Sequence, residues 1–270
     1  MNANDLNQTA AELRKLICEV SCRSRIAHLG TCLSCADILT VLYFRILNLD
    51  PAAPDREDRD RFLLSKGHGA SALYSVLALR GFISREQAFR QACAGGVDEH
   101  PVWKMLPGVE MTSGSLGHAL AIAAGMLLAG RLRNLDFRAF VLMGDGELNE
   151  GSIWETAALA AAKKLNNLCA IVDANRWQAT GRTGEITDME PLPDKFRAFG
   201  WQVIRVNGHD CTELAEALDQ AGKKTQPLAV ICDTVKGKGV DFMEDDNNWH
   251  YRIPKEPELS EALKQLDGGK

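Results

Sequence analysis

Five short runs of aliphatic and β-branched residues alternate with helical patterns from Arg61 onward, and this alternation limits the folds open to the chain. Strands that alternate with helices typically form a mostly parallel sheet with helices on both faces. The sequence therefore predicts an α/β fold of that kind. The expected strands are 61–64, 138–143, 167–173, 202–206 and 228–233, and the expected helices are 70–80, 84–92, 116–131, 152–164 and 212–221.

Further helices are expected before the first strand. Thr9 and Glu12 have the spacing of a capping box, and apolar residues follow them at helical intervals. A second helix is expected to follow Ser34 and to run to Ile46. Because the chain shows no internal repeat and no Ser/Gly-rich linker, residues 1–270 are expected to form a single domain.

Three stretches fit neither the strand nor the helix pattern: residues 93–115, 174–193 and 236–257. Loops of this length are uncommon in a compact domain and are usually functional or disordered. In open parallel sheets, ligands bind beyond the carboxyl ends of the strands. We therefore expect the three stretches to gather at that edge of the sheet and to surround a site.

The sharpest local signal is Gly144-Asp145-Gly146-Glu147, which follows an apolar strand and precedes a helix. Asn175 ends the next expected strand, so Asp145 and Asn175 are predicted to lie side by side at the carboxyl edge. A carboxylate and an amide oxygen suit Mg²⁺, and glycine-flanked backbone before a helix suits a diphosphate. The alternative is that Gly-Asp-Gly forms only a turn.

The histidines form a second signal. Four of the six lie in loop-like contexts at the ends of expected elements, where imidazoles suit proton transfer and hydroxyl binding. The other two, His118 and His209, are expected to be structural or to face solvent. The four loop histidines are His28, His68, His100 and His250.

Several blocks of the sequence resemble the N-terminal, diphosphate-binding half of transketolases, and the resemblance runs through nearly the whole chain. The blocks are His28-Leu29-Gly30 with Ala36-Asp37-Ile38, Ser65-Lys66-Gly67-His68 with Leu73-Tyr74, His100-Pro101 with residues 106–110, residues 112–117, and Gly144-Asp145-Gly146 with Glu150-Gly151 and Asn175. Gly-Asp-Gly with a distant Asn is shared by thiamine diphosphate enzymes in general. The Ser-Lys-Gly-His and His-Pro blocks indicate transketolase.

The resemblance implies a thiamine diphosphate-binding fold and a cofactor held through a divalent cation, Mg²⁺ or alternatively Ca²⁺ or Mn²⁺. It implies that Asp145, Asn175 and the main-chain oxygen of Trp177 coordinate the metal. The residues it implies for cofactor binding are His68, Gly114, Leu116, Gly144, Gly146, Glu150 and Asn175.

The resemblance also implies that His28, His100 and His250 face the hydroxyls and carbonyl of a sugar, where imidazoles move protons near neutral pH. The expected reaction is transfer of a two-carbon ketol unit from a ketose to an aldose. The chain departs from the commoner family pattern at Leu29, Trp177 and Tyr251. These departures leave sugar specificity open, including a branched or sulfonated sugar as the acceptor.

A partner chain is expected, because no second glycine-rich α/β unit follows the diphosphate-binding half before Lys270. We expect this chain to be one subunit of a split transketolase, inactive alone and assembled as an α2β2 heterotetramer. The partner would carry the pyrimidine domain and the activating glutamate. Glu150 and Glu155 match acidic residues at the family's subunit interface, although acids at a helix start also favour the helix dipole.

Other interpretations are less well supported. The α subunit of a 2-oxo acid dehydrogenase and deoxyxylulose-phosphate synthase are expected to lack the Ser-Lys-Gly-His and His-Pro blocks, and a non-catalytic relic need not keep Asp145, Asn175 and the histidines. A net charge of −5 argues against nucleic-acid or membrane binding. No secretory or membrane-spanning pattern is visible, so a cytoplasmic setting is expected. Cys32-x-x-Cys35 fits a helix better than a zinc site, and Lys236-Gly237-Lys238-Gly239 does not match a P-loop.

Overall fold

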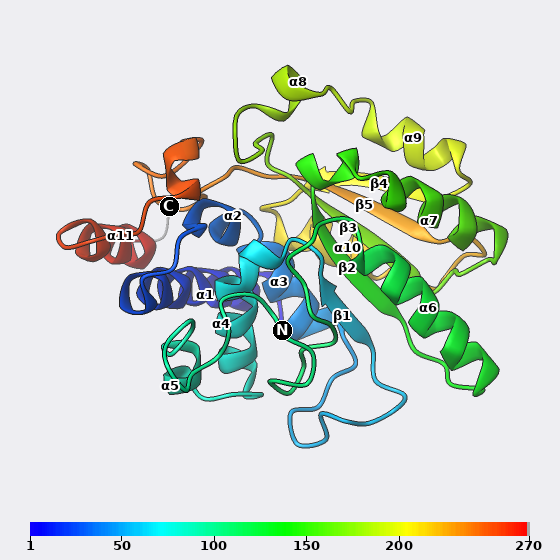
Figure 1. Ribbon diagram of the computed structural model, residues 1–270, viewed down its shortest axis with the longest axis horizontal. Helices are drawn as coiled ribbons and strands as arrows, with labels where there is room; N and C mark the ends of the chain where they lie inside the picture. Colours follow the sequence, from blue (N-terminus) through cyan, green and yellow to red (C-terminus); the bar gives the residue numbers. More distant parts are fainter. Residues whose placement is uncertain (269–270) are drawn as a thin grey trace.

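The computed structural model describes residues 1–268 of the chain, which form one five-stranded sheet. The sheet lies at the centre of the molecule (Figure 1). The strand order is β1-β2-β3-β5-β4, and every neighbouring pair is parallel. The predicted α/β fold is therefore confirmed, with strand ends within one residue of expectation. The strands are β1 (Arg61–Leu64), β2 (Ala139–Gly144), β3 (Leu168–Ala174), β4 (Gln202–Asn207) and β5 (Leu228–Asp233).

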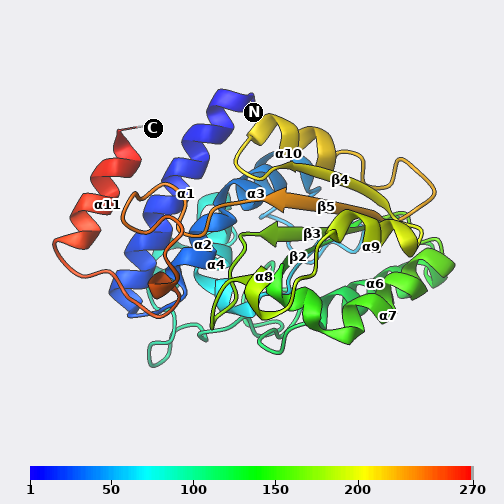
Figure 2. The same cartoon turned by 90° about the horizontal axis from the view of Figure 1, so that it is seen from above.

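Helices cover both faces of the sheet (Figure 2). Successive strand residues point to opposite sides, so an apolar strand places side chains in a core on each face. Phe140 and Leu142 of β2 pack into the core under the N-terminal helices, whereas Val141 and Met143 pack into the core on the other face. Both faces are apolar, as expected for a buried parallel sheet. The first face is covered by α1 (Ala3–Ser24), α3 (Ala36–Val41), α4 (Ala70–Arg80) and α10 (Cys211–Leu218), and the second by α6 (Ala119–Leu132), α7 (Gly151–Ala162) and α9 (Leu192–Ala198).

The capping box predicted at Thr9 is wrong. Helix α1 begins at Ala3, and Asn2 forms the reciprocal capping box with Asp5, whose backbone N–H lies 3.0 Å from the Asn2 side-chain oxygen. Thr9 lies in the second turn and donates its hydroxyl to the Asp5 carbonyl at 2.8 Å. Because residues 3–9 include no glycine or proline, the helix extends back to the earlier cap.

The helix expected to follow Ser34 and to run to Ile46 is confirmed, although another short helix precedes it and its last turn is π-helical. The chain forms α2 (Leu29–Ser34), breaks at Cys35, and continues as α3 and then as a π-helical turn, η1 (Leu42–Ile46). Ser34 ends α2, and its hydroxyl donates to the Asp173 carboxylate at 2.6 Å, which ties the end of this short helix to β3.

The remaining helices differ from expectation mainly in length. The expected helix 84–92 forms one turn, α5 (Arg85–Ala88), capped by Ser84. Helix α6 starts at Ala119 and not at 116, because Gly117 has φ +83°, which is not helical. Helix α11 (Glu258–Asp267) packs beside α1 (Figure 2). No helix among the described residues combines the length and the apolar character that a bilayer span needs.

The three long loops do meet at the carboxyl edge of the sheet, as predicted. Stretch 174–193 leaves β3 and contains the short helix α8 (Thr183–Ile186), and stretch 236–257 follows β5 and contains the turn η4 (Asn247–His250). The two are joined by a hydrogen bond from Asn247 to the Ala179 carbonyl, 3.1 Å long. The third stretch reaches the end of β1, where the backbone of Gly114 approaches Gly67. This edge therefore holds the candidate site.

Candidate active site

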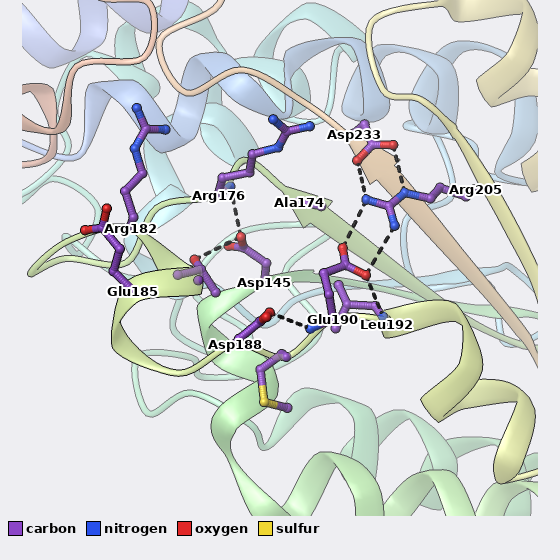
Figure 3. A pocket seen from close by; sticks show the side chains of 13 residues that line it. Asp145, Ala174, Arg176, Arg182, Glu185, Asp188, Glu190, Leu192, Arg205 and Asp233 are labelled. Atoms are coloured by element: carbon purple, nitrogen blue, oxygen red, sulfur yellow. Dashed lines mark hydrogen bonds and ion pairs between the residues drawn. The ribbon is translucent and has the colours of Figure 1, made fainter.

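Asp145 lies at the turn between β2 and the short helix η3 (Gly146–Asn149), and its side chain is buried. Its carboxylate accepts a hydrogen bond from the backbone N–H of Arg176 at 2.9 Å and one from the Thr183 hydroxyl at 3.0 Å (Figure 3). It also accepts a hydrogen bond from the backbone N–H of Gly146 at 2.9 Å. Burial, together with the nearby charge of Asp173, raises the pKa of Asp145 to about 6. A bound cation would favour the ionised form of this carboxylate.

Asn175 lies one residue beyond β3, on the strand adjacent to β2. Its side-chain oxygen accepts a hydrogen bond from the Trp177 backbone N–H at 3.1 Å, and its amide nitrogen donates to Asp173 at 3.1 Å. The bond from the Arg176 N–H to Asp145 brings the Asp145 carboxylate against this same segment. The structure thus brings Asp145 together with residues 175–177, as the strand spacing predicted.

A buried ion pair beneath the site was not anticipated from the sequence. Lys66 and Asp173 are 1% and 0% exposed, and the Lys66 ammonium contacts the Asp173 carboxylate. Lys66 also donates to the Thr31 carbonyl at 2.9 Å, and Thr234 donates its hydroxyl to Asp173. The Lys66 charge and these hydrogen bonds outweigh burial, so the pKa of Asp173 is lowered and that of Lys66 is raised. The pair ties β1, β3 and α2 together under the site.

Three of the four loop histidines form a cluster. The ring of His28 lies 5.4 Å from that of His68 and 4.7 Å from that of His250, centroid to centroid. Burial lowers the pKa of His250 to about 4 and that of His68 to about 2, helped by the charges of Lys236 and Lys66, and burial also lowers the pKa of His28. These three rings are therefore neutral at pH 7 in the free chain.

Lys236, which the sequence reasoning considered only for a P-loop, faces the same cluster. Its side chain is 1% exposed, and its ammonium donates to Asn247 at 2.7 Å and lies 3.2 Å from the Nδ1 atom of His250. Burial and the charge of Lys66 lower the pKa of Lys236 to about 8. A cationic donor thus lies beside the histidines that the sequence reasoning singled out.

His100 and Gly114 form another wall of the site. A Cβ atom at Gly114 would lie 3.8 Å from the His100 ring, and one at Gly67 would lie 2.7 Å from the Gly114 backbone nitrogen. Only glycine at position 67 permits this approach, which brings the loop of His100 to the end of β1. Leu116, also predicted to bind the cofactor, follows in the same loop and is partly buried.

Glu147, to which the sequence reasoning gave no role, holds this loop in place. Its buried carboxylate accepts hydrogen bonds from the backbone N–H groups of Gly117 at 2.7 Å and Gly144 at 3.1 Å, and from the Ser65 hydroxyl. It therefore joins the ends of β1 and β2 to the loop that carries Gly114. Glu150, by contrast, is exposed beside Gly117, and Glu155 is exposed on α7.

Several features of the site fit a polar ligand. A Cβ atom added to Gly144 would meet nothing within 4 Å, so open space faces the backbone there. Buried polar atoms without a hydrogen-bond partner among the described residues include His28 Nδ1, Ser113 Oγ and Gln178 Nε2. Residues 1–268 hold no group of three or more His, Cys, Asp or Glu side chains suited to a metal. A metal here would therefore need the amide and main-chain oxygens proposed from the sequence.

A pocket of about 380 Å³ is lined by Asp145 and extends towards Arg205 of β4 and Asp233 of β5 (Figure 3). On its wall Arg205 donates to Asp233 at 2.8 Å and to Glu190 at 3.0 Å, so this guanidinium is already neutralised. No histidine of the described chain lines the pocket. The pocket therefore shares Asp145 and Arg176 with the candidate site and includes none of its histidines.

The two remaining histidines behave as predicted. His118 is exposed, and its ring nitrogen lies 2.9 Å from the Leu116 carbonyl. His209 is structural: its Nδ1 atom lies 2.7 Å from the Asp37 carboxylate, and its Nε2 atom accepts a hydrogen bond from the Val235 backbone N–H. The Arg14 guanidinium, together with His209, holds the pKa of Asp37 at about 2 against the effect of burial.

Comparisons with known proteins identify a family and several relatives. The profile of the transketolase, thiamine diphosphate binding domain family matches residues 6–268. The chain is 38% identical to an apulose-4-phosphate transketolase subunit of Phocaeicola vulgatus, covering 98% of this chain and 95% of that protein. It is 40% identical to a 6-deoxy-6-sulfo-D-fructose transketolase subunit of Clostridium sp. (strain MSTE9), covering 97% of this chain and 96% of that protein.

Full-length transketolases match over part of their length. The chain is 36% identical to human transketolase and covers 43% of it. The crystal structure of transketolase from Campylobacter jejuni superposes with a TM-score of 0.93 at 32% identity, covering 99% of this chain and 43% of that one. The chain thus spans about two fifths of these proteins, and nearly all of the two subunits named above.

Proposed function

We propose, because the chain belongs to the transketolase thiamine diphosphate binding domain family, that it supplies the diphosphate- and metal-binding half of a two-subunit transketolase. The observation that carries the proposal is the meeting of Asp145, the 175–177 segment and the cluster of His28, His68 and His250 at one sheet edge. Relatives of the same length are named as transketolase subunits, which supports a partner chain.

In this proposal, Mg²⁺ is held by oxygen atoms of Asp145, Asn175 and the Trp177 main chain, with Ca²⁺ or Mn²⁺ as substitutes. The diphosphate lies against the backbone of Gly144 and Gly146. When bound, thiamine diphosphate supplies the carbanion chemistry that ketol transfer needs. The residues proposed to contact the rest of the cofactor are His68, Gly114, Leu116 and Glu150.

The proposed work of His28, His100 and His250 is to hold the sugar. A neutral imidazole has one donor and one acceptor nitrogen, so it can bind a hydroxyl and a carbonyl oxygen without carrying charge. The low pKa values of His28 and His250 keep these rings neutral in the free chain. Negative charge that develops on a substrate oxygen would raise these pKa values and let a ring take up and return a proton.

The proposed donor is a ketose that carries a phosphate or sulfonate. The names of two relatives contain an apulose phosphate and a sulfonated fructose, which supports a specificity outside the common sugar phosphates. The departures at Leu29, Trp177 and Tyr251 lie at or beside the proposed site residues. The relatives are named as transketolases, and none of those described above favours the 2-oxo acid dehydrogenase, deoxyxylulose-phosphate synthase or relic interpretations.

The proposed partner carries the pyrimidine-binding domain and the activating glutamate, and the assembly holds two copies of each chain. Helices α6 and α7 support an interface, because they expose Ile122 and Leu159 at 38% and 44% beside the exposed Glu155. Glu150, at the start of α7, is proposed to lie at the same interface.

The experiment that tests the proposed function compares the chain alone with the chain co-purified with a partner of roughly 300 residues encoded in an adjacent reading frame. Each sample receives thiamine diphosphate and Mg²⁺, and ketol transfer is followed with a panel of ketose phosphates and sulfonated ketoses. We expect activity only from the complex, and loss of that activity with EDTA. Robust activity of the chain alone would refute the need for a partner chain, and an inactive complex that binds the cofactor would refute ketol transfer.

A further inference from the structure

The side chain of Trp177 contacts two charged residues, Asp245 and Arg182. Its indole N–H donates to the Asp245 carboxylate at 2.8 Å, and the Arg182 guanidinium lies 3.8 Å above its ring. Arg182 also donates to both oxygens of Asp245, at 2.6 Å each. These three residues close a ring of mutual contacts, which we name the clasp.

The clasp joins two loops that are far apart in the sequence. We name residues 175–182 the cofactor loop. They form a small hairpin in which Trp177 and Arg182 pair as an antiparallel β-bridge, and the Gln178 N–H donates to the Gly181 carbonyl at 2.8 Å. Asp245 belongs to residues 236–250, here the histidine loop, and is pinned by its own N–H, which donates to the Lys236 carbonyl at 2.8 Å. The clasp therefore connects the proposed metal-binding backbone to the loop that ends in His250.

A second contact, between Asn247 and Ala179, joins the same two loops. Asn247 donates to the Ala179 carbonyl of the cofactor loop at 3.1 Å, and its oxygen accepts from Lys236, which lies 3.2 Å from His250 Nδ1. The histidine loop between 245 and 250 is thus tied to the cofactor loop at two points. Movement of one loop cannot leave the other in place without breaking these contacts.

The contacts of the clasp fix the orientation of its three side chains relative to one another. A bidentate guanidinium–carboxylate pair fixes orientation, and an arginine stacked on an indole adds a cation–π contact. The Arg182 and Asp245 side chains are 35% and 55% exposed, so the ion pair alone would contribute little to stability. Its effect is to fix the position of the two loops relative to each other.

We propose that Trp177, Arg182 and Asp245 are positioning residues that couple the cofactor loop to His250, so that the histidine takes its working position only when the cofactor loop is fixed. This inference rests on the proposed function, because it assigns a role to loops around the cofactor. The side chain of Trp177 acts here, while its main-chain oxygen remains available to the metal.

The test uses the assembled complex and measures hydrogen exchange of residues 243–251 before and after addition of thiamine diphosphate and Mg²⁺. In the wild type we expect the ligands to slow exchange in both loops. In Asp245→Ala and Arg182→Ala we expect the ligands to slow exchange in the cofactor loop as in the wild type, and to slow it less in residues 243–251, where only the Asn247–Ala179 link remains. Cofactor affinity and kcat should each fall about five- to tenfold, and the double variant should be no worse than either single one.

A matched control breaks an ion pair of similar exposure elsewhere: Glu12→Ala removes the partner of Arg85, whose pair is 44% and 51% exposed. This variant should behave as the wild type. Asp245→Asn, which keeps an acceptor for the Trp177 indole, should give a smaller loss than Asp245→Ala. Protection of residues 243–251 by the ligands that stays at the wild-type level in Asp245→Ala and Arg182→Ala would overturn the clasp alone. A wild-type complex that binds no cofactor would overturn the proposed function and the clasp with it.

Discussion

Asp145→Ala is expected to abolish Mg²⁺-dependent binding of thiamine diphosphate by the assembled enzyme. The carboxylate is the one charged oxygen donor in the proposed metal set, and without it the ion has only the neutral oxygens of Asn175 and Trp177. Loss of an outer-shell partner already costs up to about 100-fold in metal affinity, so the loss of a direct ligand should exceed that factor. Calorimetry with the cofactor at fixed Mg²⁺ measures the change.

Glu185→Ala is the matched control for this prediction. Glu185 lines the same pocket beside Asp145 but is exposed. Its removal should leave the cofactor affinity unchanged. Asp145→Asn keeps the size of the side chain and should lose binding as Asp145→Ala does. Undiminished affinity in both Asp145 variants would remove the metal assignment from this residue.

Lys66→Met is expected to destabilise the folded chain by about 3–5 kcal/mol, because it leaves the Asp173 charge buried without a compensating cation. Asp173 would keep hydrogen bonds from Ser34, Thr234 and Asn175, but these do not neutralise it. Urea unfolding of the full chain, followed by circular dichroism, measures the free energy of unfolding.

Two further variants test the cause of that loss. Lys66→Met combined with Asp173→Asn should recover part of the stability, because no unpaired buried charge remains. Lys223→Met removes an exposed pair with Asp219, 54% and 58% exposed, and should change the stability by less than about 0.5 kcal/mol. A Lys66→Met change as small as that of Lys223→Met would show that the buried pair contributes no net stability.

The sheet was predictable because its signals are local. Residues 168–172 of strand β3 (Leu168–Ala174) are a continuous apolar run, and strands of this kind form only when both faces are covered. The adjacency of Asp145 to the segment after β3 follows from parallel pairing of neighbouring strands, and the register bears it out. The helix start near Thr9 was mispredicted because an earlier capping box at Asn2 decided it.

The rest of the site depends on contacts between residues far apart in the chain. Lys66 and Asp173 are 107 positions apart, and nothing in either local sequence distinguishes a buried charge from a solvated one. Glu147 lies inside the recognised motif, yet its partners Gly117 and Ser65 belong to other segments. The lowered pKa values of His68 and His250 arise from burial and from Lys66 and Lys236, which only the folded chain brings together.

Asp145 and Asn175 are proposed to hold a cation against the diphosphate of thiamine diphosphate. The most direct measurement is a crystal structure of the two-subunit complex grown with the cofactor and Mg²⁺. We expect a metal about 2.0–2.1 Å from the Asp145 carboxylate, the Asn175 side-chain oxygen and the Trp177 carbonyl, in contact with the diphosphate. A diphosphate seated away from these residues, with neither side chain touching the metal, would contradict it.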